Sequence, residues 1–239
     1  VGYLLVLLHM SAAKKVGFYT LGCKLNFSET STIAREFEAG GFVRARQGET
    51  ADVYVVNSCS VTEHADKKCR NIVRRIVRTN PDAIVAVTGC YAQLRPQDLA
   101  AIDGVDLVIG NNDKGSIYER VSALGAKRKA SVHTCEAGEL TNFFAAFSTG
   151  DRTSSFLKVQ DGCNYHCSYC TIPLARGASR NLPIADLAAE AQRIAAQGQV
   201  STPAISAERP ANRSSTCCGP STGSKASIAT AFRRSSRTC

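Results

Sequence analysis

The sequence predicts an α/β fold, in which a doubly wound parallel sheet is followed by the beginning of a second βα domain. The 239 residues are 44% hydrophobic and 21% charged, a balance typical of one or two soluble globular domains. From residue 14 onward, β-rich runs alternate four times with segments of helical periodicity, which favours a parallel sheet covered by helices. A further apolar strand then leads into a cysteine-rich loop and another helical segment.

Each element of the first domain has its own local signal. Strands are predicted where short β-rich runs occur, at residues 15–20, 52–58, 83–89 and 105–110. The first helix is expected to open on Ser28 as N-cap and to close on the pair Gly40 and Gly41. The second, residues 65–81, carries an apolar face and stops at Pro81. Two shorter helices are predicted at residues 96–102 and 113–124.

These signals divide the chain into five parts. Met10 is the only methionine, so the residues before it are expected to be spurious upstream sequence. A strand at 154–160 and a helix at 182–198 form the first unit of the second domain. The predicted parts are a spurious or disordered leader, 1–13; the α/β domain, 14–125; a linker with a hairpin, 126–154; the first unit of the second domain, 155–198; and a disordered tail, 199–239.

Charge and cysteine content limit the compartment and the partners. The formal charge of +9 suits a polyanionic partner, but +5 of it lies in the last 39 residues, so it is weak support for nucleic-acid binding. The apolar start is about ten residues long where a membrane crossing needs about twenty, so no membrane partner is expected. In the reducing cytoplasm, where we place the protein, its 11 cysteines favour metal or redox chemistry over disulfides.

Three cysteines each follow a predicted strand of the first domain. They are Cys23 in "TLGCKLN", Cys59 in "VVNSCS" and Cys90 in "VTGCYAQ". Because ligands bind outside the carboxyl ends of parallel strands, the topology is expected to bring these thiols to one edge of the sheet. The alternative is that they are three small buried hydrophobic side chains, as cysteine often is.

A second trio is compressed into "DGCNYHCSYCTIPLARG", where Cys163, Cys167 and Cys170 are spaced C-x3-C-x2-C. Structural zinc normally takes four protein ligands in paired arrangements, and the nearest additional candidate, His166, lies inside the loop. In an iron–sulfur cube, three thiolates would leave one iron open. The missing fourth ligand then becomes the functional feature.

Together, the four cysteine motifs resemble the radical S-adenosylmethionine methylthiotransferases, in the branch that acts on N6-threonylcarbamoyladenosine at position 37 of tRNA. The resemblance covers about residues 12–198. It implies that the second domain is the start of an incomplete radical-SAM (β/α) partial barrel. It also implies two [4Fe-4S] clusters: a cluster on Cys163, Cys167 and Cys170 whose open iron binds S-adenosylmethionine, and an auxiliary cluster on the first trio.

The same resemblance implies the reaction and its partners. An electron, from a donor such as flavodoxin or ferredoxin, cleaves S-adenosylmethionine, and the resulting radical takes hydrogen from C2 of the adenine. The auxiliary cluster presents the methylated sulfur to be inserted. The partner is the anticodon-loop adenosine of tRNA. Tyr169, next to Cys170, is expected to contact S-adenosylmethionine or to form a wall of the cluster loop.

Other residues receive simpler interpretations. Cys69 lies on the apolar face of its helix and is expected in the core, and Cys135 has no paired ligand. Arg176 and Gly177 match the end of the family's loop, without a role derivable from the sequence. The opposite side of the Cys69 helix is a solvated face or a phosphate-contacting surface, formed by Lys67, Lys68, Arg70, Arg74, Arg75 and Arg78.

The chain departs from the family after Gly198. Of the last 39 residues, 14 are Ser or Thr, and a single acid accompanies six basic side chains. We therefore expect a reading-frame error there and a truncated, inactive copy. Three alternatives to the tRNA enzyme remain open: a methylthiotransferase for a ribosomal protein, a non-catalytic iron–sulfur electron-transfer protein, and a zinc-stabilised RNA-binding module.

Overall fold

The computed structural model describes residues 13–46, 48–124, 130–149, 154–165 and 167–205. The predicted leader, except for residue 13, therefore lies outside the described residues, as do His166 and the tail after residue 205. The strands are β1 (Lys15–Thr20), β2 (Val43–Arg44), β3 (Val53–Ser58), β4 (Ile84–Gly89), β5 (Leu107–Ile109), β6 (Ser131–His133), β7 (Ser154–Gln160) and β8 (Val200–Ile205). The α-helices are α1 (Lys24–Ala39), α2 (Glu63–Thr79), α3 (Cys90–Leu94), α4 (Pro96–Ala100), α5 (Ile117–Ala123), α6 (Ile172–Arg176) and α7 (Ile184–Ala196), with short 3₁₀ turns η1 (Lys114–Ser116) and η2 (Ala137–Glu139).

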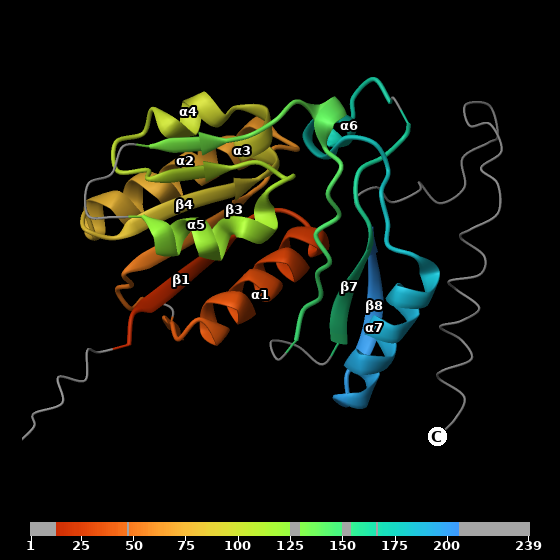
Figure 1. Cartoon of the computed structure of the whole chain (residues 1–239). Coiled ribbons are helices and arrows are strands. Elements are labelled where there is room, and N and C mark those ends of the chain that lie inside the picture. Colours follow the sequence, from red (N-terminus) through yellow and green to blue (C-terminus); the bar gives the residue numbers. More distant parts are fainter. Residues whose placement is uncertain (1–12, 47, 125–129, 150–153, 166, 206–239) are drawn as a thin grey trace, which may run out of the picture.

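The first domain is built on a six-stranded sheet in the order β2-β1-β3-β4-β5-β6, in which every pairing is parallel (Figure 1). The chain leaves β1 toward one edge of the sheet and returns at β3 to build the other side. In a sheet of this order the switch point lies between β1 and β3, where the connections diverge to opposite faces. The predicted fold class is confirmed.

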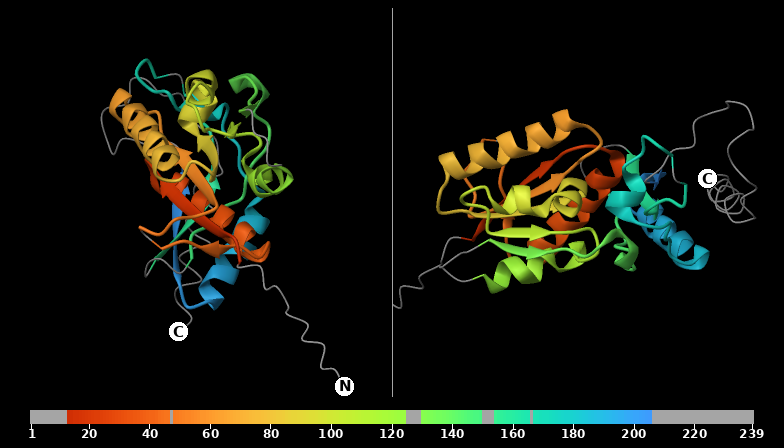
Figure 2. Two further views of the ribbon diagram at one scale, coloured as in Figure 1. Left: turned by 90° about the vertical axis from the view of Figure 1, so that its left-hand side faces the viewer. Right: turned by 90° about the horizontal axis from the view of Figure 1, so that it is seen from above.

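Helices cover both faces of this sheet and create two separate cores. On one face, α2 and α4 bury Cys69, Val73 and Leu99 against the strands. On the other face, α1 and α5 bury Phe37 and Ile117. Figure 2, seen from above, shows α2 and α5 on opposite sides of the sheet. The strands between them have side chains buried on both faces, as the run of six buried residues in β3 requires.

The start of α1 differs from the prediction. Ser28 is not the N-cap; it is buried inside the helix, where its hydroxyl donates to the carbonyl of Leu25 at 2.8 Å. The helix begins directly after Cys23, because Gly22 adopts a φ of 96° and turns the chain out of β1 at once. The predicted end is confirmed, with Gly40 as C-cap.

The second helix agrees closely with its prediction. The hydroxyl of Thr62 caps α2 by accepting from the amide of Ala65, and the helix ends at Thr79, just before Pro81. Cys69 is fully buried in the core, as predicted. Burial, reinforced by the nearby Asp66 carboxylate, raises the pKa of Cys69 to about 12, so this thiol stays protonated.

Several short elements were not predicted. Strand β2 adds an edge to the sheet beside β1, and helix α3 begins at Cys90, immediately after β4. Strand β6 lies in the stretch assigned to the linker and pairs in parallel with β5, while an antiparallel bridge between Phe147 and Leu157 occupies the region of the predicted hairpin. Residues 200–205, assigned to a tail without secondary structure, form β8.

The second unit is a βαβ motif of β7, α7 and β8, with β7 and β8 paired in parallel. Leu157 and Val159 of β7 pack against Leu187 and Ile194 of α7 in a third, smaller core. Helix α1 of the first domain lies against β7, so the two units share a surface (Figure 1). Among the described residues, no helix is long and apolar enough to cross a membrane.

The burial of Cys69 leads to a prediction about stability. Cys69→Ser places a polar hydroxyl in the apolar core, and we expect it to lower the free energy of unfolding by about 1–3 kcal/mol. Cys69→Ala removes only sulfur packing and should cost less. Urea unfolding followed by circular dichroism measures both. A Cys69→Ser variant as stable as the parent would contradict the core assignment.

Candidate metal centre

The first cysteine trio lies at the carboxyl edge of three neighbouring strands. Cys23 follows β1, Cys59 follows β3 and Cys90 follows β4, and these strands are adjacent in the order β1-β3-β4. Their last paired residues are in register, because Thr20 faces Asn57 and Ser58 faces Gly89. The structure therefore places the three thiols at one edge of the sheet, near the switch point. Their role as ligands stays a prediction.

Glycines allow the first and third cysteine turns to pack on the second. Gly22 precedes Cys23, and a Cβ atom there would lie 2.7 Å from the Sγ of Cys59. Gly89 precedes Cys90 with a φ of 100°, and a Cβ atom there would lie 2.3 Å from the carbonyl oxygen of Ser58. Both distances are below any real carbon contact, so only glycine permits this close approach.

A buried hydrogen-bond frame holds the turns in place. The Asn26 side-chain amide donates to the carbonyl of Leu21 at 2.7 Å and to that of Ser58 at 3.0 Å, so it joins the turns that contain Cys23 and Cys59. The Ser58 hydroxyl donates to the carbonyl of Thr88 at 2.5 Å, which extends the frame to the turn before Cys90. The sequence analysis missed Asn26, although it stands inside the quoted motif "TLGCKLN".

The three thiols differ in exposure and influence one another. Cys59 and Cys90 are buried and Cys23 is exposed. Burial raises the pKa of Cys59, and the neighbouring thiols of Cys90 and Cys23 raise it further. A hydrogen bond from the Val61 backbone and, more weakly, the positive charge of Arg176 lower it. The thiol of Cys59 thus lies within electrostatic range of both partners and of one buried cation.

The second trio lies on the loop between β7 and α6. Cys163 is buried and its amide donates to the carbonyl of Gly177 at 3.0 Å, which closes the base of the loop. Cys170 is half-buried, and its amide donates to the carbonyl of Cys167 at 3.0 Å. Cys167 is exposed. The neighbouring Tyr169 is 86% exposed, so it does not form a packed wall of the loop in this structure.

The two cysteine loops are neighbours in space. Helix α3, which begins with Cys90, packs against α6, which begins two residues after Cys170 (Figure 1). The side-chain amide of Asn111, at the end of β5, donates to the carbonyl of Ala175 in α6 at 2.6 Å. The segments that carry the two trios, far apart in the sequence, therefore meet at the same edge of the sheet.

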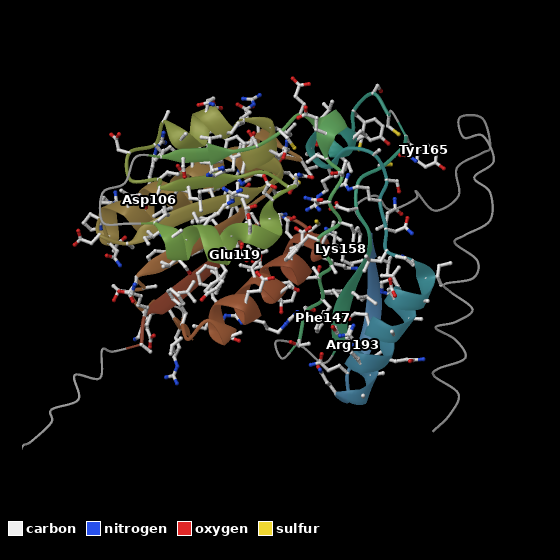
Figure 3. The ribbon with its side chains drawn as sticks, in the orientation of Figure 1. Asp106, Glu119, Phe147, Lys158, Tyr165 and Arg193 are labelled. Atoms are coloured by element: carbon white, nitrogen blue, oxygen red, sulfur yellow. The ribbon has the colours of Figure 1, made fainter. Side chains whose placement is uncertain are left out.

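Beneath both loops lies a buried charge cluster of five ionised side chains, each at most 3% exposed: Glu29, Lys114, Lys158, Asp161 and Arg176. The Glu29 carboxylate is 2.6 Å from Lys114, 2.8 Å from Lys158 and 2.9 Å from Arg176. Asp161 is 2.7 Å from Lys158 and 2.8 Å from Arg176. In Figure 3, Lys158 of β7 lies beside α1. The cluster thus ties α1 and η1 of the first domain to β7 and α6 of the second.

The cations keep both carboxylates ionised despite complete burial. Burial alone would raise the pKa of Glu29, but Arg176, Lys114 and Lys158 together hold it well below its usual range. The pKa of Asp161 is likewise lowered, because Arg176 and Lys158 outweigh the cost of burial. The sequence analysis missed four of these residues and found no role for Arg176. The reason is that polar side chains in a helical or strand pattern are ordinarily assigned to the solvent-facing side.

The donor atoms of the first trio are of the type that iron–sulfur clusters use. Among the residues that the structure describes, no three His, Cys, Asp or Glu side chains converge closely enough to bind one metal ion. A cube distributes its thiolates over several irons, and three thiols lining one sheet edge, with a buried cation nearby, are suitable donors for it.

Comparisons with known proteins agree with these motifs. The model of the "Uncharacterized protein family UPF0004" matches residues 15–110. Threonylcarbamoyladenosine tRNA methylthiotransferase MtaB from Bacillus subtilis (strain 168) is 39% identical over 185 residues, which are 77% of this chain and 41% of that protein. The protein of the same name from Aquifex aeolicus (strain VF5) is 38% identical over 77% of this chain and 45% of its own length.

Two further similarities are weaker. The tRNA-2-methylthio-N(6)-dimethylallyladenosine synthase from Thermobifida fusca (strain YX) is 30% identical over 80% of this chain and 40% of that protein. The radical S-adenosylmethionine methyltransferase TsrM from Kitasatospora setae, a solved structure, superposes with a TM-score of 0.49 at 15% identity, covering 81% of this chain and 48% of that one. The matched part of the chain spans less than half the length of each of the three tRNA-modifying relatives.

The close approach at Gly22 leads to a prediction with a matched control. Gly22→Ala combines a positive φ, which costs about 1–2 kcal/mol for other residues, with overlap onto Cys59. Gly41→Ala, at a φ of 88° with open space around it, should incur only the backbone cost. We expect Gly22→Ala to be the less stable variant in urea unfolding. Equal losses would show that Gly22 and Cys59 are not in contact.

Glu29 leads to a prediction about pH. Because its folded pKa is lowered, its pairing stabilises the fold above the unfolded value of about 4.3, and that stabilisation is lost as pH falls toward the folded pKa. Glu29→Gln should therefore unfold about 3–5 kcal/mol more easily at pH 7, because it leaves buried cations unpaired. The difference from the parent should shrink below about pH 4 when both are followed by urea unfolding.

Glu36 provides a control of opposite sign. Burial, with Glu119 nearby, raises the pKa of Glu36 to about 7. The ionised form is therefore disfavoured in the fold, and stability is lost as pH rises from the unfolded pKa toward that value. Glu36→Gln should match the parent at pH 4 and exceed it at pH 8, as measured by urea unfolding. A difference that did not change with pH would contradict this prediction.

Proposed function

The chain belongs to the family of radical S-adenosylmethionine methylthiotransferases, and from that premise we propose that it serves methylthiolation of N6-threonylcarbamoyladenosine at position 37 of tRNA. The observation that carries this proposal is the meeting of two cysteine trios on adjacent loops, in a chain 39% identical to an MtaB protein over 185 residues. The relatives are more than twice as long as the matched region, so we attribute the complete activity to full-length proteins of this family.

The two trios divide the work. In this proposal Cys163, Cys167 and Cys170 hold one [4Fe-4S] cluster with an open iron for S-adenosylmethionine, and Cys23, Cys59 and Cys90 hold the auxiliary cluster. When bound, the cluster on Cys163, Cys167 and Cys170 supplies the electron that cleaves S-adenosylmethionine. Three-cysteine ligation at both sites, without a fourth thiol on either loop, supports the assignment of two open irons.

The surrounding residues orient these two sites and determine how far water can reach them. Cys59 and Cys90 are buried and Cys23 is exposed, and hydrogen bonds of Asn26 and Ser58 fix the three turns, so two of the three auxiliary ligands are shielded from water. Cys167 and Tyr169 are exposed at the rim of the other loop, where a cofactor and an electron donor such as flavodoxin or ferredoxin can approach. The Tyr169 ring is free to stack on the adenine of S-adenosylmethionine.

A basic surface beside the site supports an RNA substrate. The exposed side of α2 carries Lys67, Lys68, Arg74, Arg75 and Arg78, with Arg70 half-buried. The Arg70 guanidinium donates to the hydroxyl of Tyr91 at 2.6 Å, and Tyr91 follows Cys90 directly. The basic surface therefore begins at the cysteine edge, where phosphates flanking a bound adenosine would lie. This favours tRNA over a ribosomal-protein substrate.

Iron content tests the proposal. Anaerobic reconstitution of the full chain should give about eight irons, four for each cube. Cys163→Ala and Cys59→Ala should each lose about four, and should lose different clusters by electron paramagnetic resonance. Cys69→Ala is the control and should lose none. Unchanged iron in either cysteine variant would refute that ligand assignment, and a colourless protein with zinc would favour the zinc-stabilised module.

A further inference from the structure

The buried charge cluster contains more positive than negative charge. Three cations, Lys114, Lys158 and Arg176, face two carboxylates, Glu29 and Asp161. Arg180, whose side chain is 12% exposed, adds a fourth cation at 3.6 Å from Asp161. Removing an unbalanced charge from water is expensive in a protein interior, so this excess calls for an anion nearby.

The excess charge lies on the side of the first cysteine trio. Arg176 belongs to the loop of the second trio, yet its guanidinium donates to the Asn26 side-chain oxygen at 2.7 Å. The same Asn26 side chain donates to the carbonyls of Leu21 and Ser58, beside the turns that carry Cys23 and Cys59. One amide side chain therefore separates Arg176 from these turns.

The packing agrees with this geometry. Helix α6, which ends with the buried Arg176, packs against α3, which begins with Cys90. A purely structural clamp between the two domains would not need excess positive charge on that side, since buried ion pairs contribute little net stability.

We propose that Arg176, with Lys114 and Lys158 beside it, is the counter-charge for an anionic iron–sulfur cluster on Cys23, Cys59 and Cys90. The inference rests on the proposed function, because it requires that cluster. Three thiolates around a dicationic core leave a net negative charge, and one-electron reduction adds another. Arg176 is thus a positioning residue: by docking its own loop, it brings to the auxiliary site a charge that raises the cluster's reduction potential.

The experiment uses the full 239-residue chain with Cys163→Ala, so that only the auxiliary cluster is present. Its midpoint potential is measured by dithionite titration followed by electron paramagnetic resonance. In Arg176→Met we expect the ratio of reduced to oxidised cluster, at the parent's midpoint, to fall about tenfold, equivalent to a shift of about 59 mV for one electron. Arg176→Lys retains the charge and should restore most of this shift.

Arg35 offers a matched control. Its guanidinium donates from α1 to the carbonyl of Phe147 at 2.9 Å and to the Thr149 hydroxyl at 3.2 Å, so it also ties α1 to the segment before β7. It makes none of the ion pairs of the buried charge cluster. Arg35→Met should weaken the contact between the two units and leave the midpoint unchanged. A shift equal to that of Arg176→Met would overturn the inference, because docking alone would then explain it.

The outcomes separate this inference from the proposed function. If the Cys163→Ala chain binds no iron, both fail together. If it binds iron and Arg176→Met leaves the midpoint unchanged, the inference alone is overturned. Should Arg176→Met fail to fold, as judged by circular dichroism, Lys114→Met removes another charge of the same cluster and must shift the midpoint in the same direction. No shift in that variant would also overturn the inference.

Discussion

The described structure depends most on one buried carboxylate, that of Glu29. It is 1% exposed on α1 and pairs with three cations from three other elements: Lys114 of η1, Lys158 of β7 and Arg176 of α6. Since Glu29 cannot be hydrated, its charge is tolerated only while all these elements stay in place. The position of the second cysteine loop relative to the sheet therefore depends on the pairing of Glu29, together with the hydrogen bond from Asn111 to Ala175 and the packing of α3 on α6. The third core packs only the second unit internally.

Backbone geometry imposes the second constraint, at three Gly-Cys dipeptides. Gly22, Gly89 and Gly162 each have positive φ, and a Cβ atom at any of them would lie within 2.7 Å of a neighbouring segment. Each glycine lets the chain turn sharply after a strand. The cysteine that follows it is therefore held close to a neighbouring segment of the fold. Cys59 has no glycine before it: Gly22 packs against Cys59 itself, and Gly89 packs against the preceding residues Asn57 and Ser58.

What could be predicted from the sequence, and what could not, follows from the range of each interaction. The strand-helix alternation and the gathering of Cys23, Cys59 and Cys90 at one edge depend on local periodicity and on parallel topology, and both were predictable. The first residue of α1 was mispredicted because the cap preference of Ser28 is weaker than the turn imposed by Gly22. Strand β6 is three residues long and has only half-buried side chains, so it carries almost no alternation to detect.

The charge cluster was beyond prediction for a different reason. Glu29 and Lys158 are 129 residues apart, and each stands in an element where a polar side chain ordinarily marks the solvent face. Only the arrangement of both units turns those faces inward. The same arrangement gives the cysteines within each trio different surroundings: Cys59, Cys90 and Cys163 are buried near the segments that the charge cluster joins, whereas Cys23 and Cys167 are exposed. Each trio therefore has at least one thiol fixed inside the fold and one that faces solvent.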